Sequence, residues 1–147
     1  MTERVLEILF EHQHRGVEFD WLAADHAGHV GFFSTAGFGP IPAEVLGSNA
    51  IENVESLVKS LPVVANAVVS REWGHDIGDW TRVAARGLFA FDWRISTSSY
   101  DLIARPERPI SVSLFVERTT QFSHLVLPMN FASLTRISAN KLGWTAE

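Results

Sequence analysis

The stretch VEFDWLAADHAGHVGFFST, residues 17–35, carries the clearest fold signal in the chain. Two apolar runs, each of strand length, flank the four residues from Asp25 to Gly28. A short loop that contains glycine, which can adopt a positive φ, is typical of the turn in a β-hairpin. The stretch therefore predicts two antiparallel strands, with Gly28 supplying the positive φ.

The chain leaves this hairpin through GFFSTAGFGPIP, residues 31–42, which is rich in glycine and proline. A phosphate-binding loop of GxGxxG form would need a third glycine at position 42 and amide N–H groups along the turn. Pro42 occupies that position. Pro40 and Pro42 also lack an amide N–H. The segment therefore predicts a rigid turn rather than a nucleotide site.

Helical patterns occupy the N-terminus and the middle of the chain. Apolar residues at helical spacing mark each of them, and glycine or proline follows where each is expected to end. Two of the three also begin at residues that are typical helix caps. The expected helices are 3–14, a helix from the capping box Asn49–Glu52 to Leu61, and 80–86 with Asp79 as its N-cap.

Strand patterns dominate from residue 88 onward. Residues 110–117, ISVSLFVE, show the cleanest alternation of apolar and polar side chains. Prolines at both ends of 106–109 predict a turn over 105–109, since proline cannot donate to a strand ladder. Residues 131–142 are expected to form a closing helix, and 63–70 fit either a strand or a buried helix. The expected strands are 88–93, 99–105, 110–117 and 122–128.

These patterns together predict an α+β fold, with residues 1–147 as a single domain. Its antiparallel sheet would combine the N-terminal hairpin with a C-terminal meander of about four strands, packed with three to four helices. With 46% hydrophobic and 20% charged residues, the composition is that of a globular domain. Ten phenylalanines and five tryptophans supply large side chains for its core.

The composition also excludes several classes of site. The chain has no cysteine, which excludes disulfides, thiolate metal ligands and a cysteine nucleophile. The N-terminal segment has acidic residues every few positions, unlike a signal peptide, and no window reaches the roughly 18 apolar residues of a membrane span. We expect a cytoplasmic protein with no membrane partner. We also expect no cofactor.

Charge is distributed unevenly along the chain. The net charge is −5, but residues 1–79 carry −8 and residues 80–147 carry +3. An acidic half disfavours nucleic-acid binding, and no pattern of aromatic and basic residues points to a nucleic-acid partner. The acidic half could steer a basic protein partner, or it could simply keep the protein soluble.

The stretch WGHDIGDW, residues 73–80, is the main candidate for a catalytic site. His75, Asp76 and Asp79 would be the metal ligands of a metal-dependent hydrolase. The structural alternative makes Asp79 a helix cap, Asp76 a turn residue, and Trp73 and Trp80 core side chains. We favour the structural alternative, because the further histidines that such hydrolases use are not evident.

A second cluster, Asp25, His26 and His29, lies at the hairpin loop. It could form a weak metal site, but its spacing matches no fixed ligand pattern, and exposed turn residues explain it more simply. A serine nucleophile gets no support either, since the chain has no GxSxG motif. We therefore name no catalytic residue.

The hairpin with its glycine and proline exit, followed by ARGLFAFDW and SYDLIARPERPI, resembles small bacterial proteins of the toxin-immunity type, including the broad SUKH-like group. Asp25 and Gly28 match the Asp-x-x-Gly turn of that pattern. The glycines and prolines at positions 37, 39, 40 and 42 match the exit that follows its second strand. These motifs are architectural, and they do not extend to the helices.

The resemblance implies a non-enzymatic protein that binds and neutralises a cognate toxin. Its partner would be a protein, and a basic toxin domain would suit the acidic half of this chain. Self-association into a homodimer is a further possibility, because exposed apolar strand edges often pair. The residues we expect at a partner-binding face are Asp20, Asp25, Glu44, Glu52 and Glu55.

Overall fold

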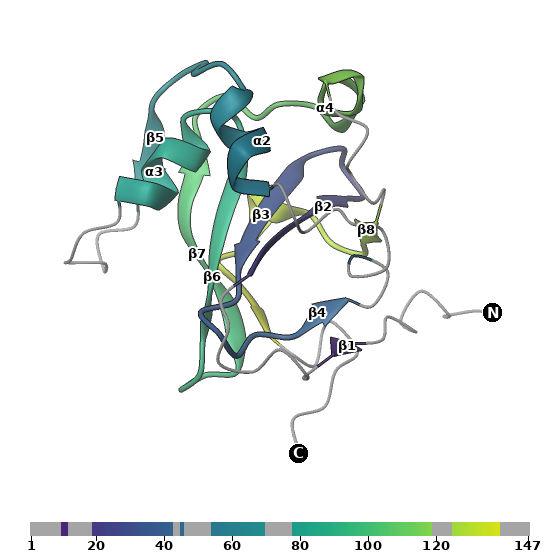
Figure 1. Cartoon of the computed structure of the whole chain (residues 1–147), viewed down its shortest axis with the longest axis vertical. Coiled ribbons are helices and arrows are strands. Elements are labelled where there is room, and N and C mark those ends of the chain that lie inside the picture. Colours follow the sequence, from purple (N-terminus) through teal and green to yellow (C-terminus); the bar gives the residue numbers. More distant parts are fainter. Residues whose placement is uncertain are drawn as a thin grey trace.

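A mixed β-sheet forms the centre of the computed structural model, which describes residues 10–11, 19–42, 45, 54–69, 78–118 and 125–138 (Figure 1). Its strands follow the spatial order β5-β7-β6-β3-β2-β8, and β9 also pairs with β7, the strand that pairs with β5. The strands are β2 (Asp20–Asp25), β3 (Val30–Ser34), β5 (Ala67–Val69), β6 (Phe89–Arg94), β7 (Ser99–Pro106), β8 (Val126–Leu127) and β9 (Arg136–Ser138).

Three α-helices and a small second sheet complete the part of the chain that is described. The second sheet pairs two short strands from distant parts of the N-terminal half. A 3₁₀-helix precedes β9. These elements are α2 (Val54–Ser60), α3 (Gly78–Ala84), α4 (Val112–Arg118), β1 (Phe10–Glu11), β4 (Ile41–Pro42) and the 3₁₀-helix Phe131–Ser133.

The predicted hairpin is confirmed. β2 and β3 pair antiparallel from Asp20 opposite Ser34 to Ala24 opposite Val30. Gly28 has a φ of +87°, as its place in the turn requires. The carboxylate of Asp25 closes the loop by accepting hydrogen bonds from the backbone N–H groups of Ala27 (3.0 Å) and His29 (2.8 Å).

The sheet is mixed, so the prediction of an antiparallel sheet is wrong. β3 pairs parallel with β6, and β2 pairs parallel with β8. Only β6 and β7 form the expected C-terminal hairpin. The reason is that the chain crosses over after β3, through α2, β5 and α3, and returns beside β3 in the same direction. Local sequence patterns carry no information on such a long-range pairing.

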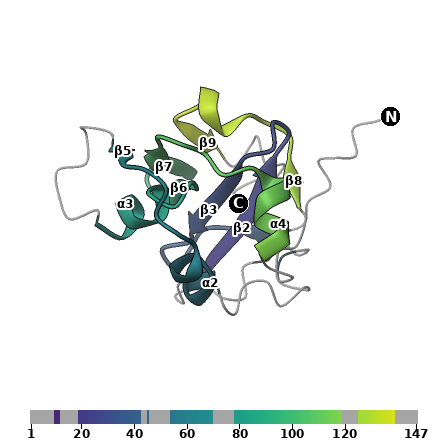
Figure 2. The ribbon, with the colours of Figure 1, turned by 90° about the horizontal axis from the view of Figure 1, so that it is seen from above.

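Side chains alternate between the two faces of the sheet and build two hydrophobic cores. On one face, Phe33 stacks between Trp21 (ring centroids 4.2 Å apart) and Phe91 (4.8 Å). On the other face, Leu22 and Phe32 pack with Val58 of α2, Val83 of α3 and Phe115 of α4. Seen from above, α2 and α3 lie on one side of β6 and β7, and β9 lies on the other (Figure 2).

The strand predicted over 110–117 is wrong, because Val112–Arg118 form a helix, α4. The alternation of apolar residues concealed a helical spacing, because Val112, Phe115 and Val116 stand at positions i, i+3 and i+4 and pack against the same core. Phe115 is fully buried, whereas Leu114 is 41% exposed. The hydroxyl of Ser111 accepts a hydrogen bond from the Leu114 backbone N–H and so caps the first turn.

The closing helix predicted over 131–142 is also wrong over residues 131–138, and the rest of that range lies outside the described residues. The chain instead forms the 3₁₀-helix and then β9, whose Ile137 is buried against the aromatic core. The ambiguous segment 63–70 resolves as β5 at Ala67–Val69, preceded by residues without regular structure. The turn predicted over 105–109 is shorter, because β7 continues to Pro106. Within 122–128, the described strand is only Val126–Leu127.

The two central helices agree with the sequence where they are described. α2 covers Val54–Ser60, and its capping box, Asn49–Glu52, lies outside the described residues. α3 begins at Gly78, so Asp79 lies in its first turn and is not its N-cap. Gly87, with a φ of +98°, follows the end of α3 as expected. Of the helix predicted over 3–14, only residues 10–11 are described, and these form β1.

Candidate functional site

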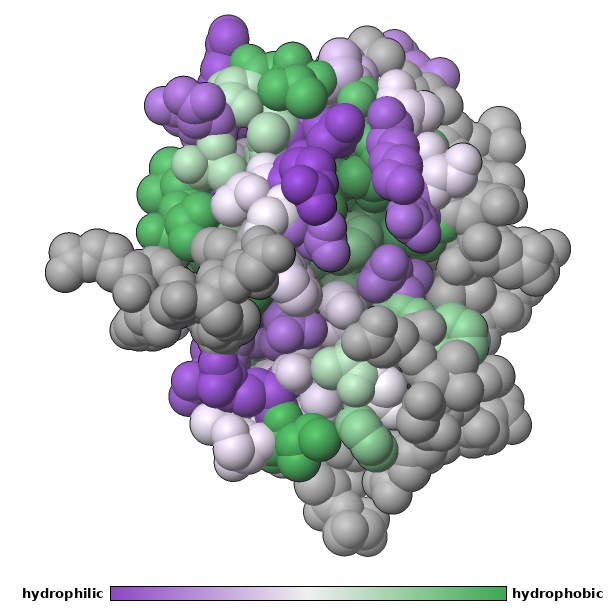
Figure 3. Space-filling model, turned by 60° about the vertical axis from the view of Figure 1, so that its left-hand side comes forward, coloured by the Kyte–Doolittle hydropathy of each residue, from purple (hydrophilic) through white to green (hydrophobic). Residues whose placement is uncertain are grey.

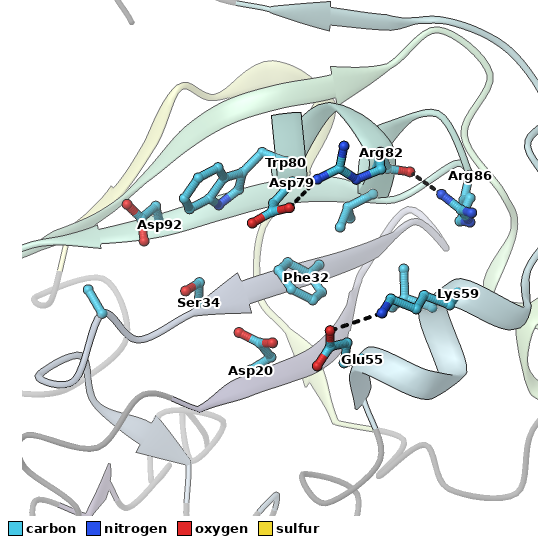
Figure 4. A pocket seen from close by; sticks show the side chains of 13 residues that line it. Asp20, Phe32, Ser34, Glu55, Lys59, Asp79, Trp80, Arg82, Arg86 and Asp92 are labelled. Carbon is cyan, nitrogen blue, oxygen red and sulfur yellow. Dashed lines mark hydrogen bonds and ion pairs between the residues drawn. The ribbon is translucent and has the colours of Figure 1, made fainter. Parts of the chain in front are cut away.

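A groove of about 780 Å³ lies between α2 and α3 and opens onto the sheet (Figure 4). We call it the α2–α3 groove. In the space-filling view, two hydrophilic ridges stand on either side of a hollow with hydrophobic side chains at its base (Figure 3). The residues that line the groove are Asp20, Phe32, Ser34, Ala36, Glu55, Val58, Lys59, Asp79, Trp80, Arg82, Val83, Arg86 and Asp92.

Three strands supply the floor of the groove in a single row. Asp20 of β2 lies opposite Ser34 of β3, and Ser34 lies opposite Asp92 of β6. Residues directly opposite each other on neighbouring strands project from the same face of a sheet. The two carboxylates therefore flank the Ser34 hydroxyl on the face that α2 and α3 cover.

The sheet face changes from apolar to polar along these strands. Two residues further along from Asp20 and Ser34, the same face carries Leu22 and Phe32, which are buried in the core under the helices. Phe32 also lines the groove, as do Val58 and Val83 from the two helices. The groove thus begins where the helices stop covering the sheet. Its base combines the carboxylates of Asp20 and Asp92 with the apolar side chain of Phe32.

The walls carry two exposed ion pairs. On α2, Lys59 Nζ lies 3.2 Å from a carboxylate oxygen of Glu55, and both side chains are at least 70% exposed. On α3, the Arg82 guanidinium pairs with the carboxylate of Asp79. Ion pairs this exposed are weak because water screens them. All four charged groups are therefore exposed at the rim of the groove.

Arg86 ties the two walls together through backbone carbonyls. Its Nε donates to the Leu61 carbonyl oxygen (3.1 Å), just after α2. Its second guanidinium contact is to the Arg82 carbonyl oxygen (2.9 Å) on α3. These bonds hold the C-terminal ends of both helices beside each other, and they place a positive charge in the groove lining.

Trp80 is the most informative residue of the groove. Its side chain packs partly against the core beneath the helices, as the sequence led us to expect, but it also lines the groove. Its indole N–H is buried, and nothing in the described part of the chain accepts a hydrogen bond from it. A buried indole N–H normally has an acceptor, and leaving one unsatisfied costs roughly 1–3 kcal/mol. Within the described residues, the indole N–H is therefore a buried donor without an acceptor.

Besides the two ion pairs of the walls, the groove has further charged residues at each end (Figure 4). Asp20, Asp92 and Ser34 lie on the floor near Trp80, whereas Lys59 and Arg86 lie beyond Phe32. We call the first region, formed by Asp20, Ser34, Trp80 and Asp92, the acidic end. The negative field of the acidic end extends through the sheet to Tyr100, whose ring lies in the opposite core.

The pKa of the Tyr100 phenol is raised, and the two floor carboxylates contribute to this rise. Burial of the phenol raises the pKa well above its usual value, and a hydrogen bond from Trp21 opposes this rise. The charges of Asp92 and Asp20 raise it further, because a phenolate would form near two carboxylates. The two floor carboxylates therefore act together as a local source of negative potential.

The structure separates the residues expected at a partner-binding face. Asp20 and Glu55 both line the α2–α3 groove. Asp25 is 2% exposed, so the expectation that it presents a carboxylate at the surface is corrected. Its two oxygens accept four hydrogen bonds, including one from the Phe131 backbone N–H (2.7 Å), because it closes the hairpin loop. Glu44 and Glu52 lie outside the described residues.

The metal hypotheses find no geometric support in the described ranges. His75 and Asp76 lie outside them, and Asp79 is paired with Arg82 on the surface. In the hairpin cluster, His29 Nδ1 lies 3.1 Å from an Asp25 carboxylate oxygen, and His26 is exposed. Within the described residues, no group of three or more potential ligands is placed to hold a metal ion.

Sequence reasoning missed the contributions of Asp92 and Trp80 to the groove. A signal for Asp92 exists in the stretch FAFDWR of β6, where a charged residue alternates with the buried Phe91 and Trp93. In a central strand, a carboxylate that points away from the buried side chains indicates that the opposite face of the sheet is not covered there. Trp80 gave no comparable signal, because a tryptophan at helical spacing also fits a core position.

Comparisons with known proteins do not identify this chain. The helices of the described segments are all too short to cross a membrane. Searches of protein families, of curated proteins and of solved structures found no match.

Proposed function

We propose that the protein is a non-enzymatic binding module of the toxin-immunity kind, which neutralises a cognate basic toxin domain by docking against the α2–α3 groove. The observation that supports this proposal is the acidic floor of an open groove with a charged rim. Hydrophobic and aromatic side chains at the centre with charged residues around them are the usual anatomy of a protein–protein interface.

The chemistry of the groove favours binding over catalysis. Ser34 lies between carboxylates, and the groove lining in the described residues includes no histidine that could serve as its base. The charged groups of the rim are exposed and not held in a closed site. Those groups suit contact with a large partner, whose surface would exclude water from them.

Charge also favours a basic partner. The net charge of the chain is −5, and its first 79 residues carry −8. Opposite surface potentials accelerate encounter, and they give a salt dependence that a purely apolar interface lacks. A basic toxin would therefore associate quickly and would be released more readily at high salt.

The test begins with capture of the partner from the native host by the tagged chain, followed by identification by mass spectrometry. The captured protein is then produced alone and together with this chain. We expect it to be basic, to arrest growth when produced alone, and to become harmless when this chain is present. A captured protein that has no effect on growth contradicts the immunity function.

A matched pair of charge reversals tests the location of the interface. Glu55→Arg changes an exposed carboxylate on the rim of the groove, and Glu117→Arg changes an exposed carboxylate on α4, away from the groove lining. We expect Glu55→Arg to weaken capture at least tenfold and Glu117→Arg to leave it within twofold. Equal effects of the two substitutions would place the interface elsewhere.

A further inference from the structure

We propose that the outer edge of β5 pairs with the same edge of a second copy of this chain, so that the central sheet continues across a two-fold axis at Val68. This edge is separate from the α2–α3 groove, whose lining includes no residue of β5, and the contact is therefore additional to the proposed function. Three features point to a second copy: the outward backbone groups of β5, the exposed valines beside it, and the lack of charge along it.

The backbone of β5 leaves two residues whose donors and acceptors point away from the sheet. In the antiparallel register of β5 with β7, the Glu107 backbone N–H donates to the Asn66 carbonyl oxygen (3.2 Å). Hydrogen-bonded and non-hydrogen-bonded pairs alternate in such a ladder, so Val68 also bonds to β7. The N–H and C=O groups of Ala67 and Val69 therefore point outward. Within the described residues, nothing pairs with β5 on that side.

These outward groups specify a register for the second copy. Antiparallel strands exchange two hydrogen bonds between residues that lie opposite each other. If Ala67 of one copy lies opposite Val69 of the other, every outward N–H and C=O group of both strands is used. The strands are then related by a two-fold axis at Val68, and such a contact closes as a dimer. A register centred on Ala67 would need the N–H of Ala65, which already donates to the Ala85 carbonyl oxygen (3.3 Å).

Exposed apolar side chains favour the same contact. Val68 is 50% exposed, and Val63 and Val64, just before the strand, are 63% and 40% exposed. In the register centred on Val68, the two copies of this side chain form a non-hydrogen-bonded pair, in which cross-strand side chains approach most closely. Their contact removes apolar surface from water in both copies.

β5 also lacks the features that keep the other edges of this sheet from pairing. Exposed edges are normally protected by charged residues or by proline. β9 carries Arg136, and β8 is two residues long and is followed at once by Pro128. Residues 61–69, LPVVANAVV, carry no charge, so two copies bring no like charges to the axis. An uncharged edge suits a second copy better than it suits the basic partner proposed for the groove.

Cysteine cross-linking tests the register directly. The chain has no cysteine, so a single introduced thiol reports a single contact. In the proposed dimer the two Cα atoms at position 68 lie about 4.5 Å apart, within the range that a disulfide spans. Under mild oxidation, we expect Val68→Cys to form a disulfide-linked dimer at least tenfold faster than Val126→Cys. The control position is similarly exposed (55%) and lies on β8, at the opposite edge of the sheet. Equal rates would overturn the proposal.

Sedimentation velocity tests the unmodified protein. Only three residues pair on each side, so the interface is small, and we expect the mass to rise from that of one chain to that of two between about 1 µM and about 500 µM. Val68→Lys places like charges opposite each other and should weaken the dimer at least tenfold, whereas Val126→Lys should leave it within twofold. Equal effects overturn the proposal. Urea unfolding verifies that both variants are folded, and if Val68→Lys is not, the cross-linking comparison decides.

Salt separates this contact from binding of the basic partner. Each copy has a net charge of −5, so two copies repel each other at low ionic strength. Raising the salt concentration from about 0.05 M to about 0.5 M screens this repulsion and should strengthen the dimer, whereas it should weaken capture of a basic partner.

Two further outcomes overturn the inference without touching the proposed function. The first is a protein that stays monomeric at every concentration and every salt. The second is a monomeric protein whose capture of the partner is weakened by Val68→Lys, which would assign the β5 edge to the partner and not to a second copy. Neutralisation of the toxin by a monomeric wild-type protein leaves the immunity function standing in both cases.

Discussion

The two aspartates that begin and end β2 should respond in opposite ways to the same substitution. Asp25 ends the strand and is buried, with both carboxylate oxygens occupied by hydrogen bonds. Asp20 begins it and lines the groove. Asparagine has the size of aspartate but replaces one acceptor oxygen with a donor. The substitutions Asp25→Asn and Asp20→Asn therefore separate a structural carboxylate from a binding one.

The cost of Asp25→Asn follows from its contacts. One oxygen accepts from the Ala27 and His29 backbone N–H groups, and the other accepts from the Phe131 backbone N–H at 2.7 Å. Whichever way the amide is turned, its NH₂ faces at least one of these donors. A buried donor left without an acceptor, together with the loss of a charged acceptor, costs about 2–3 kcal/mol.

Urea unfolding measures this effect. With an m-value of roughly 2 kcal/mol/M, a loss of 2–3 kcal/mol lowers the unfolding midpoint by about 1–1.5 M. Asp20→Asn should change stability by less than about 1 kcal/mol, because Asp20 is only partly buried whereas Asp25 is 2% exposed. Capture of the partner should show the reverse pattern: folded Asp25→Asn captures it as wild type does, and Asp20→Asn captures it at least tenfold more weakly.

Two results would refute this reasoning. If Asp25→Asn left the urea midpoint unchanged, the hydrogen bonds that join the hairpin loop to the segment at Phe131 would not matter for stability. If instead Asp20→Asn destabilised the protein as much as Asp25→Asn, the carboxylate of Asp20 would be part of the folded framework rather than of a binding site.

Three further predictions concern the fold. Phe115→Ala should lower the free energy of unfolding in urea by about 3–5 kcal/mol and Leu114→Ala by less than about 1 kcal/mol, because α4 buries Phe115 and exposes Leu114. A larger loss with Leu114→Ala would favour a strand over the helix α4. Gly39→Ala should lower the melting temperature, since its Cβ would lie 2.5 Å from the Tyr100 hydroxyl and 2.9 Å from Trp93 Cβ; an unchanged melting temperature contradicts this packing. Tyr100, the only tyrosine, has a raised pKa when folded, so above pH 10 the unfolded state releases its proton first and stability falls by up to about 1.4 kcal/mol per pH unit. Phenolate absorbance that rises before unfolding would disprove it.

The parts of the fold that local sequence specifies were predictable. The hairpin turn at Asp25–Gly28, the strands at 88–93 and 99–105, and the two central helices follow from turn residues, alternation and helical spacing. Each of these elements is settled by interactions between residues close in sequence. The β6–β7 hairpin, for example, joins two strands that are adjacent in sequence.

The errors have two physical sources. The parallel pairing of β3 with β6 joins segments that are distant in sequence, and no residue near either strand encodes it. The misassignment of 110–117 arose because apolar residues at positions 110, 112, 114 and 116 alternate, while burial of Phe115 decides the outcome. Tertiary packing can override a local strand pattern in this way.

The groove was only partly accessible from the sequence. Asp20 and Glu55 were expected at a partner-binding face because they belong to the acidic half, and both line the groove. Asp92 comes from the other half of the chain and joins Asp20 only through the β2–β3–β6 register. Charge counted along the chain cannot reveal such a row, since the sheet creates it.

The crossover between β3 and β6 has a consequence for the time at which the protein becomes competent. Both walls of the groove, α2 and α3, lie within the crossover, and Asp92 lies on the strand that closes it. Contacts distant in sequence form late, because a long loop must first be closed. During synthesis the hairpin can fold as soon as it emerges, but the groove cannot exist until β6 has emerged and found β3. A nascent chain that stops before Phe89 would thus have three of the four acidic groove residues, Asp20, Glu55 and Asp79, but no assembled groove.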